Sequence, residues 1–449
     1  MLYILILLYF LAGFGISAHF EVVKNRAERL GLSLLLGMGL HTFVVYIWEM
    51  LHIALTWTSV LLGMCLFTAL ANVAFAKTLA AYKQFFTAKW DFRLYEFPFW
   101  GMIGYMVYAS IYRAIYLPVT PYDALVGMDL LAKYAVKEGH LVSSVFTTPN
   151  LADHVQNQLF YAPFSTFSQI LTRLSGNEVG QPWLAVVFVG FLLFMYGKMR
   201  SYTHPALAGL FTLLLCMISE YFGYTFMMLT DFSCSVFFGA GIAYFYDYYN
   251  DKSLKTFVLS AVLIGLSVWA RSDTALFVAL GVVLVFAMHI RQNPKDAIIK
   301  TALFGGIPFI FFALWNVVMV NYIFPKQPVG DQIANTATDI GNLFAIYSDM
   351  ITKLMPHEIL WGYVFILFLL LGSLNLLIFR DAKGWQILVW IGIVFIGLGL
   401  IDNIFEAATL ENTVKRGLFK LIPLIYLYLS VNSLSAWVNE KLSKWESGT

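Results

Sequence analysis

The sequence predicts an all-α polytopic membrane protein, and its composition and the spacing of its apolar segments support this prediction. Of its 449 residues, 60% are hydrophobic and 12% are charged. A soluble chain usually carries about 25% charged residues. Apolar runs recur along the chain, and the longest polar interval between two of them is residues 118–180. The net charge is +2 without a basic tract, so nucleic acid is not an expected partner.

The apolar runs predict about 13 transmembrane helices of roughly 17–25 residues each. The predicted spans are 2–18, 31–50, 56–76, 97–117, 181–197, 205–221, 231–247, 256–271, 273–290, 302–323, 358–379, 385–401 and 417–437. The first run has no basic segment before it and no cleavage site, so we interpret it as a retained span.

Lysine and arginine residues gather in alternate connections between these spans. Lys24, Arg26 and Arg29 follow the first span, and Lys198 and Arg200 follow the fifth. Because basic connections stay in the cytoplasm, the N-terminus is predicted to lie outside and the C-terminus in the cytoplasm. The interval 118–180 then lies on the external side.

The external interval opens with Tyr122-Asp123-Ala124-Leu125 and continues as a predicted amphipathic helix. Its apolar face consists of residues at helical spacing, namely Leu125, Met128, Ala132 and Ala135. Charged residues interrupt the segment too often for a span, so we expect it to lie along the membrane surface. Asp123 stands where the helix starts, which fits either an N-cap or a chemical role.

Two further residues of this interval have two interpretations each. Asp129 lies four residues before Lys133, which favours a solvated ion pair, although it is also a candidate for lining the substrate. His154 fits a surface histidine or a substrate contact.

Ionisable residues at the external ends of the spans form a second set of candidates, because charges at membrane depth usually face a cavity or a partner. They are Asp231, Arg271, Asp273, Arg416 and Lys420. Each also has a simpler interpretation. Asp231 fits a helix cap, Arg271 and Asp273 fit a pair closing a hairpin, and Arg416 and Lys420 fit side chains that snorkel to lipid headgroups.

Four short segments stand in order along residues 97–437. They are Tyr122-Asp123-Ala124-Leu125, Tyr161-Ala162-Pro163, Gly265-Leu266-Ser267 with Arg271, and Arg416-Gly417-Leu418 with Pro423. Together they resemble the GT-C class of integral-membrane glycosyltransferases, as in protein mannosyltransferase and aminoarabinose transferase relatives. Ala162 replaces a proline of the family's Tyr-Pro-Pro segment, and three spans precede the loop where the family core has one.

The resemblance implies a GT-C-like fold that transfers a sugar from a polyprenyl-phosphate donor to an acceptor hydroxyl of a glycan, lipid or protein. It implies catalytic roles for Asp123 and Asp231, and binding of the donor phosphate by Arg416, Lys420 and Arg271. Substrate-lining residues would be Tyr122, Asp129, His154, Tyr161 and Asp273. A divalent metal, Mg²⁺ or Mn²⁺, stays open, because no Asp-x-Asp or Glu-x-Asp pair stands in the first loop.

These expectations define three domains. Residues 1–96 hold three N-terminal spans with cytoplasmic loops, residues 97–437 a GT-C-like core in membrane lipid, and residues 438–449 a cytoplasmic tail. The expected location is a bacterial inner membrane with the site on its periplasmic face. The alternatives are a transporter or flippase of lipid-linked sugars, and a ligase or polymerase that uses lipid-linked oligosaccharide. A transporter would place ionisable residues near the centres of spans.

Overall fold

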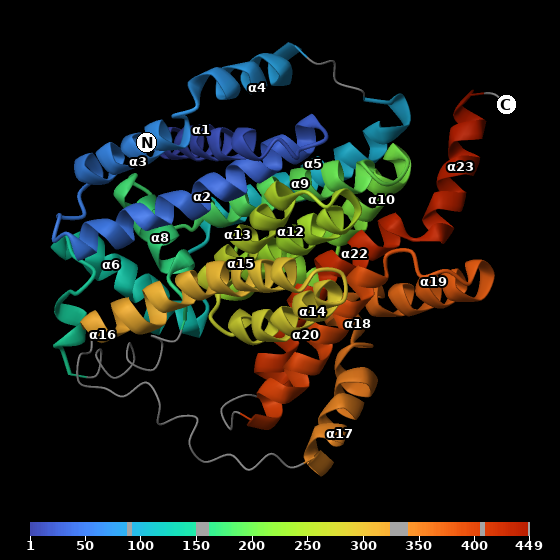
Figure 1. The fold of residues 1–449 in the computed structure, drawn as a ribbon. Coiled ribbons are helices and arrows are strands. Elements are labelled where there is room, and N and C mark those ends of the chain that lie inside the picture. The colour runs from blue at the N-terminus through green and yellow to red at the C-terminus, as the bar shows by residue number, and fades with distance from the viewer. Residues whose placement is uncertain (88–91, 150–160, 324–339, 405–408, 448–449) are drawn as a thin grey trace. The chain divides into compact units, whose positions relative to one another are not determined.

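The computed structural model describes residues 1–87, 92–149, 161–323, 340–404 and 409–447, which are helical and contain no strand (Figure 1). This confirms the all-α prediction for the described part of the chain. The chain divides into two compact units. The first unit consists of Met1–Ser201, Gly223–Ser233 and Trp269–Ser272, and the second of Tyr202–Phe222, Cys234–Val268 and Asp273–Thr449.

The first unit begins with four helices, α1 (Leu2–Phe20), α2 (Arg26–Met50), α3 (Trp57–Ala71) and α4 (Phe75–Thr87). The Asn25 side chain starts α2 by accepting a hydrogen bond from the Glu28 amide, 3.0 Å away. Helices α1 and α2 contact along their lengths. The single span predicted at 56–76 is instead two helices, because the chain bends by 90° between α3 and α4.

The next part of the first unit contains the long polar interval at residues 118–180. Its helices are η1 (Leu94–Glu96), α5 (Phe97–Tyr116), η2 (Ala124–Met128), α6 (Asp129–Glu138), η3 (Ser144–Phe146), α8 (Phe164–Leu174) and α9 (Pro182–Arg200). A proline in the first turn starts α5 and α9, where it removes no intrahelical hydrogen bond. Helix α9 packs against α2 and α5.

Helices α12 (Thr230–Asp251) and α13 (Leu254–Ala270) contribute residues to both units, and α11 (Ser219–Gly223) adds its last residue, Gly223, to the first. The other helices are α10 (Pro205–Cys216), α14 (Thr274–Ile290), α15 (Pro294–Ala313), η4 (Leu314–Met319), α16 (Val320–Ile323), α17 (Ile340–Asp349), η5 (Met350–Leu354), α18 (Glu358–Trp361), α19 (Val364–Phe379), α20 (Trp385–Ile404), η6 (Leu410–Val414), α21 (Lys415–Gly417), η7 (Leu418–Lys420), α22 (Leu421–Val431) and α23 (Ser433–Ser447).

Aromatic side chains fill the core of the second unit. Trp390 of α20 is fully buried, and its ring lies 6.0 Å from Phe238, 5.6 Å from Phe245 and 5.8 Å from Phe304. These distances between ring centres are those of favourable aromatic pairs. The cluster joins α12, α15 and α20 into one packed layer.

Five helical segments of the described chain are long and apolar enough to cross a membrane, and up to seven if each of two bent pairs counts as one span. The five are α1, α2, α9, Pro294–Ile323 and α20. Every predicted span overlaps a helix, but the count of about 13 is not confirmed, because a span needs about 20 residues and α10, α13, α14 and α19 are shorter.

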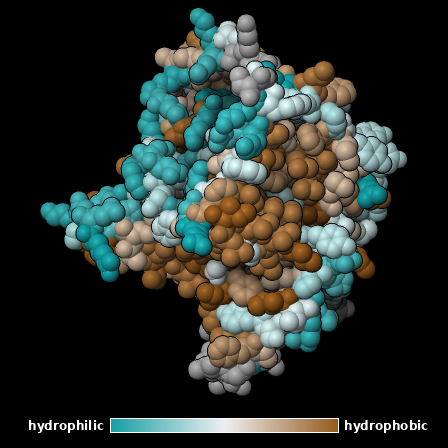
Figure 2. Space-filling view, turned by 90° about the vertical axis from the view of Figure 1, so that its right-hand side faces the viewer, coloured by the Kyte–Doolittle hydropathy of each residue, from teal (hydrophilic) through white to brown (hydrophobic). Residues whose placement is uncertain are grey.

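Exposed apolar side chains agree with the membrane assignment. Apolar residues cover much of the face drawn in Figure 2. In the second unit, α19 alone exposes 59% of Leu369 and 73% of Leu377. Water-facing surfaces seldom carry apolar patches this large, whereas lipid-facing surfaces do.

Candidate functional site

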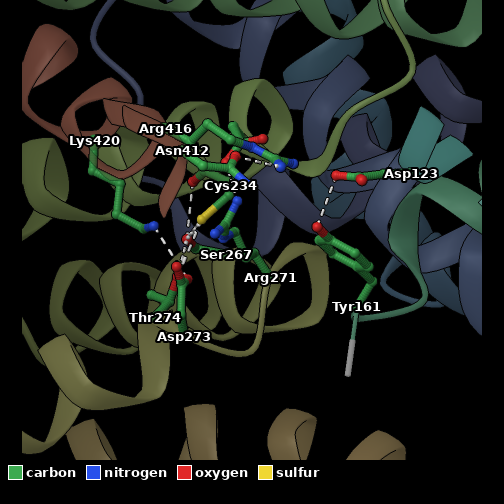
Figure 3. Close-up of polar contacts among 11 residues, drawn as sticks. Asp123, Tyr161, Cys234, Ser267, Arg271, Asp273, Thr274, Asn412, Arg416 and Lys420 are labelled. Carbon is green, nitrogen blue, oxygen red and sulfur yellow. Dashed lines mark hydrogen bonds and ion pairs between the residues drawn. The ribbon is translucent and has the colours of Figure 1, made fainter. Parts of the chain in front are cut away.

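Asp123 lies in the first turn of the helix that follows α5. Pro121 precedes this turn, and its carbonyl accepts a hydrogen bond from the Ala124 amide at 3.0 Å. The Asp123 side chain makes no capping hydrogen bond. Instead it accepts one from the Tyr161 hydroxyl, 2.8 Å away, and the two side chains point toward each other in Figure 3. The N-cap interpretation of Asp123 is therefore wrong, because the carboxylate faces a side chain 38 residues away.

The amphipathic helix after Asp123 is present, and most of its predicted apolar face is buried. Met128, Ala132 and Ala135 are at most 2% exposed, but Leu125 is 47% exposed. Residues 124–128 form a π-helical turn, which holds more residues per turn than an α-helix and so rotates Leu125 away from that face. Tyr122, at the start of the helix, is 64% exposed.

Asp129 does not form the predicted solvated pair with Lys133. It is 3% exposed, and both of its carboxylate oxygens accept hydrogen bonds from Arg173 of α8, at 2.7 and 2.9 Å. Gln169 of the same helix donates to it at 3.0 Å and accepts from the indole of Trp183. The bidentate pair therefore ties α6 to α8 inside the first unit.

Asp231 and Arg271 form a buried ion pair in the first unit. The Gln181 amide holds the segment before Asp231 by donating to the Phe226 carbonyl at 2.6 Å. The segment before Arg271 is held by Trp269, whose ring stacks on Phe43 of α2 at 4.6 Å. The sequence predicted a helix cap for Asp231, and the structure shows an ion pair with Arg271, which lies 40 residues away.

Three lysine and arginine residues of the second unit follow the π-helical turn η6 within one short stretch. Lys420 is 1% exposed and forms an ion pair with Asp273 at 3.2 Å, and Arg416 is 7% exposed and donates to Asn412 at 3.3 Å (Figure 3). Lys415 pairs with Glu220 at 2.9 Å. The snorkelling interpretation of Arg416 and Lys420 is wrong for both, because their side chains are buried within the protein.

Arg271 and Asp273 were candidates for a pair that closes a hairpin. The structure gives each of them a partner from elsewhere in the chain, Asp231 for Arg271 and Lys420 for Asp273. Sequence spacing could not reveal these partners, which lie 40 and 147 residues away.

A cluster of small polar groups in the second unit was missed in the sequence. The Ser267 hydroxyl donates to the Cys234 carbonyl at 2.9 Å, and the Cys234 thiol lies 3.1 Å from the Thr274 hydroxyl. All three residues are buried. Ser267 belongs to the Gly-Leu-Ser segment at 265–267, and that segment was the one available signal.

The candidate site residue His154 lies outside the described residues. Among the residues that the structure does describe, no three histidine, cysteine, aspartate or glutamate side chains are grouped so that they could hold a metal ion.

The geometry thus provides a half-buried carboxylate, Asp123, and buried ion pairs at Asp129 and Asp231 in the first unit. In the second unit, buried Lys420 pairs with the half-buried Asp273. Comparison of the chain with family models, with curated proteins and with solved structures finds no match. The assignment of the candidate site therefore depends on the residues of this chain alone.

Proposed function

We propose that the chain is a membrane glycosyltransferase that moves a sugar from a polyprenyl-phosphate donor to an acceptor hydroxyl. Two features support this. The chain has apolar helices suited to a membrane, where such a lipid donor resides. It also presents a carboxylate suited to general base catalysis at the start of its largest polar interval.

The proposal depends on one observation, the partial exposure of the Asp123 carboxylate. A general base must reach the proton that it removes, so it needs a carboxylate open to the substrate. Asp123 is half-buried and accepts a hydrogen bond from the Tyr161 hydroxyl. Asp129 and Asp231 are almost fully buried, at 3% and 2% exposed. Asp123 therefore suits the base role better than either of them.

In the proposed reaction, Asp123 takes the proton of the acceptor hydroxyl while that oxygen bonds to the anomeric carbon of the sugar. The bond between this carbon and the phosphate oxygen breaks, and polyprenyl phosphate leaves with the electron pair. A guanidinium group stabilises the anionic leaving group without a metal, and we assign this role to Arg416. Lys420 and Arg271 are further candidates for phosphate binding.

The remaining candidates take supporting roles in this proposal. Tyr161 orients the Asp123 carboxylate through its hydrogen bond, and exposed Tyr122 offers a ring for stacking against a sugar. Asp273 positions Lys420 through their ion pair. Asp129 would hold α6 against α8 through its ion pair with Arg173 and would not touch the substrate. A catalytic role for Asp231 would require its ion pair with Arg271 to open.

The test is turnover of a labelled polyprenyl-phosphate monosaccharide by the purified protein in detergent, with an extract of cell-envelope glycan as acceptor. Asp123→Asn should bind the donor but lose about 10²–10⁴-fold in turnover, the usual contribution of a general base. The matched control is Glu138→Gln, an exposed carboxylate of the same helical segment, which should keep normal turnover.

Full activity of Asp123→Asn would remove the base assignment, and loss of activity in Glu138→Gln as well would show that the substitutions act through folding. Movement of label across proteoliposomes without release of polyprenyl phosphate would identify a flippase and overturn the enzyme proposal.

A further inference from the structure

The first unit contains a cavity of about 540 Å³, away from Asp123. It lies between the N-terminal end of α2, the C-terminal end of α9, α4 and the start of α5. Its volume falls within the roughly 300–1,000 Å³ typical of small-molecule sites. Nothing in the proposed transfer reaction uses it.

Positive charge and aromatic rings define the lining. Four cationic side chains line the cavity, Lys24, Arg26, Arg29 and Arg200, and none of the described lining residues is acidic. Phe85, Phe92, Trp100 and Tyr196 supply the aromatic part. Such a lining suits an anionic group attached to an apolar body.

Two of these cations are held in place by rings of the same cavity. The Arg26 guanidinium lies 5.7 Å from the centre of the Phe85 ring, and that of Arg200 lies 5.7 Å from the Tyr196 ring. Arg200 also lies 3.9 Å from the buried carboxylate of Glu96. These contacts order the Arg26 and Arg200 side chains beside the cavity.

A second buried acid, at the end of α2, pairs with a lysine that is not among the lining residues. Glu28 is fully buried and forms an ion pair at 2.9 Å with Lys198, which is also fully buried. Glu28 therefore adds no net negative charge at the end of α2, and the cationic lining keeps its preference for anions.

The cavity lies at the ends of two candidate membrane spans. Helices α2 and α9 are both long and apolar enough to cross a membrane, and each has one end at the cavity. Helix α4 makes an angle of 90° with α3, packs along α1 and exposes 71% of Phe86 (Figure 1). A helix that turns by 90° from an apolar helix and exposes apolar side chains suits a position in the membrane interface.

We propose that this cavity binds the phosphate of an anionic phospholipid headgroup, whose acyl chains follow the exposed apolar side of α4. Phosphate accepts bidentate hydrogen bonds from arginine, and anionic lipids concentrate at the cytoplasmic leaflet, where the basic connections of this chain are predicted to lie. A soluble phosphate compound would share the same recognition chemistry, so the experiment must separate the two sources.

The experiment is native mass spectrometry of the full-length protein in neutral detergent, where no charged membrane surface attracts the protein. The probes are phosphatidylglycerol, phosphatidylcholine and inorganic phosphate. We expect selective retention of phosphatidylglycerol. Arg26→Gln/Arg29→Gln should weaken it roughly 30-fold, from about 1 kcal/mol for each basic residue near an anionic lipid.

Two further double variants control for charge and position. Arg26→Lys/Arg29→Lys keeps both charges but removes the planar guanidinium forks, so it should weaken binding less than Arg26→Gln/Arg29→Gln does. Lys77→Gln/Lys83→Gln removes two charges from α4 outside the cavity lining and should leave binding unchanged. Lys24→Gln changes an exposed residue and should weaken binding about 5-fold, which provides a test if the double arginine variant does not fold.

Equal retention of phosphatidylglycerol and phosphatidylcholine would overturn the proposal, and so would an equal loss in the α4 control. Displacement of phosphatidylglycerol by millimolar inorganic phosphate would reject the lipid and identify a soluble phosphate ligand. None of these readouts depends on glycosyltransferase activity.

Discussion

Asp129 illustrates how a charged residue changes its role when it is buried. The four-residue spacing between Asp129 and Lys133 predicted a surface ion pair, which contributes little stability in water. The structure instead encloses the carboxylate and gives it a bidentate partner, Arg173, whose side chain is 8% exposed. A buried pair of this kind contributes little over apolar packing, but loss of one partner leaves an uncompensated buried charge.

Asp129→Asn should therefore reduce the free energy of unfolding by about 3 kcal/mol, the low end of the cost of breaking a buried ion pair. The measurement is denaturant unfolding in detergent, followed by tryptophan fluorescence. The matched control is Asp349→Asn, which breaks an exposed pair with Lys353 at 2.8 Å and should cost less than about 0.5 kcal/mol. Equal effects of the two changes would contradict the structural role of Asp129.

Arg416 allows a second test at a single residue. We expect Arg416→Lys to raise the KM for the lipid donor by about 10-fold or more, because an ammonium group cannot replace the planar fork on a phosphate and a charged hydrogen bond is worth about 1.5–3 kcal/mol. The measurement is donor titration at saturating acceptor, with Lys353→Gln as an exposed control. An unchanged KM and kcat in Arg416→Ala would move the phosphate-binding assignment to Arg271.

The sequence predicted where helices lie along the chain better than it predicted their lengths and the bends between them. Every predicted span overlaps at least one helix, since apolar runs of this length form helices in lipid. The break between α3 and α4 was missed because 56–76 is mostly apolar, although Asn72 stands where α3 ends.

The contacts of the candidate site were the least predictable part. Tyr161 and Asp123, and Arg173 and Asp129, are joined by tertiary folding across 38 and 44 residues. No spacing rule for a single helix covers such separations. The π-helical turns that follow Asp123 and precede Lys415 also have no sequence signature, although such turns are common at functional sites.

Close contact between α1 and α2 depends on glycine. A Cβ atom placed on Gly37 would lie 1.7 Å from the Tyr9 carbonyl oxygen, and one on Gly13 would lie 1.7 Å from that of Ser33. Both clashes involve backbone, which cannot move without separating the helices. Small residues have this role in membrane helix pairs generally, because they let backbones approach.

Gly37→Ala should therefore push α1 and α2 apart and cost at least about 3 kcal/mol, the upper part of the range for overpacked sites. The control is Gly306→Ala on α15, where an added Cβ meets nothing within 4 Å. That change should be neutral or slightly stabilising, because alanine favours helices over glycine by about 1 kcal/mol. Thermal unfolding in detergent compares the two variants, and a stable Gly37→Ala would contradict the tight packing.

For the whole molecule, both proposals depend on which side of the membrane each polar segment occupies. The alternating basic connections predict that the interval at 118–180 lies outside and the connection between α12 and α13 inside. An external Asp123 is required for a donor used on the outer face. The same prediction places the cavity at Lys24–Arg29 on the cytoplasmic side, where the leaflet is rich in anionic lipid.

Accessibility of single cysteines to a membrane-impermeant maleimide in intact cells tests this arrangement. The exposed Cys65 is first replaced by serine, whereas buried Cys216 and Cys234 can stay. Thr148→Cys, on an exposed residue of the external interval, should be labelled, and Lys255→Cys, equally exposed at the start of α13, should be labelled only after the cells are opened. The reverse pattern would place Asp123 in the cytoplasm, and a lipid-linked donor used on the outer face could not reach it.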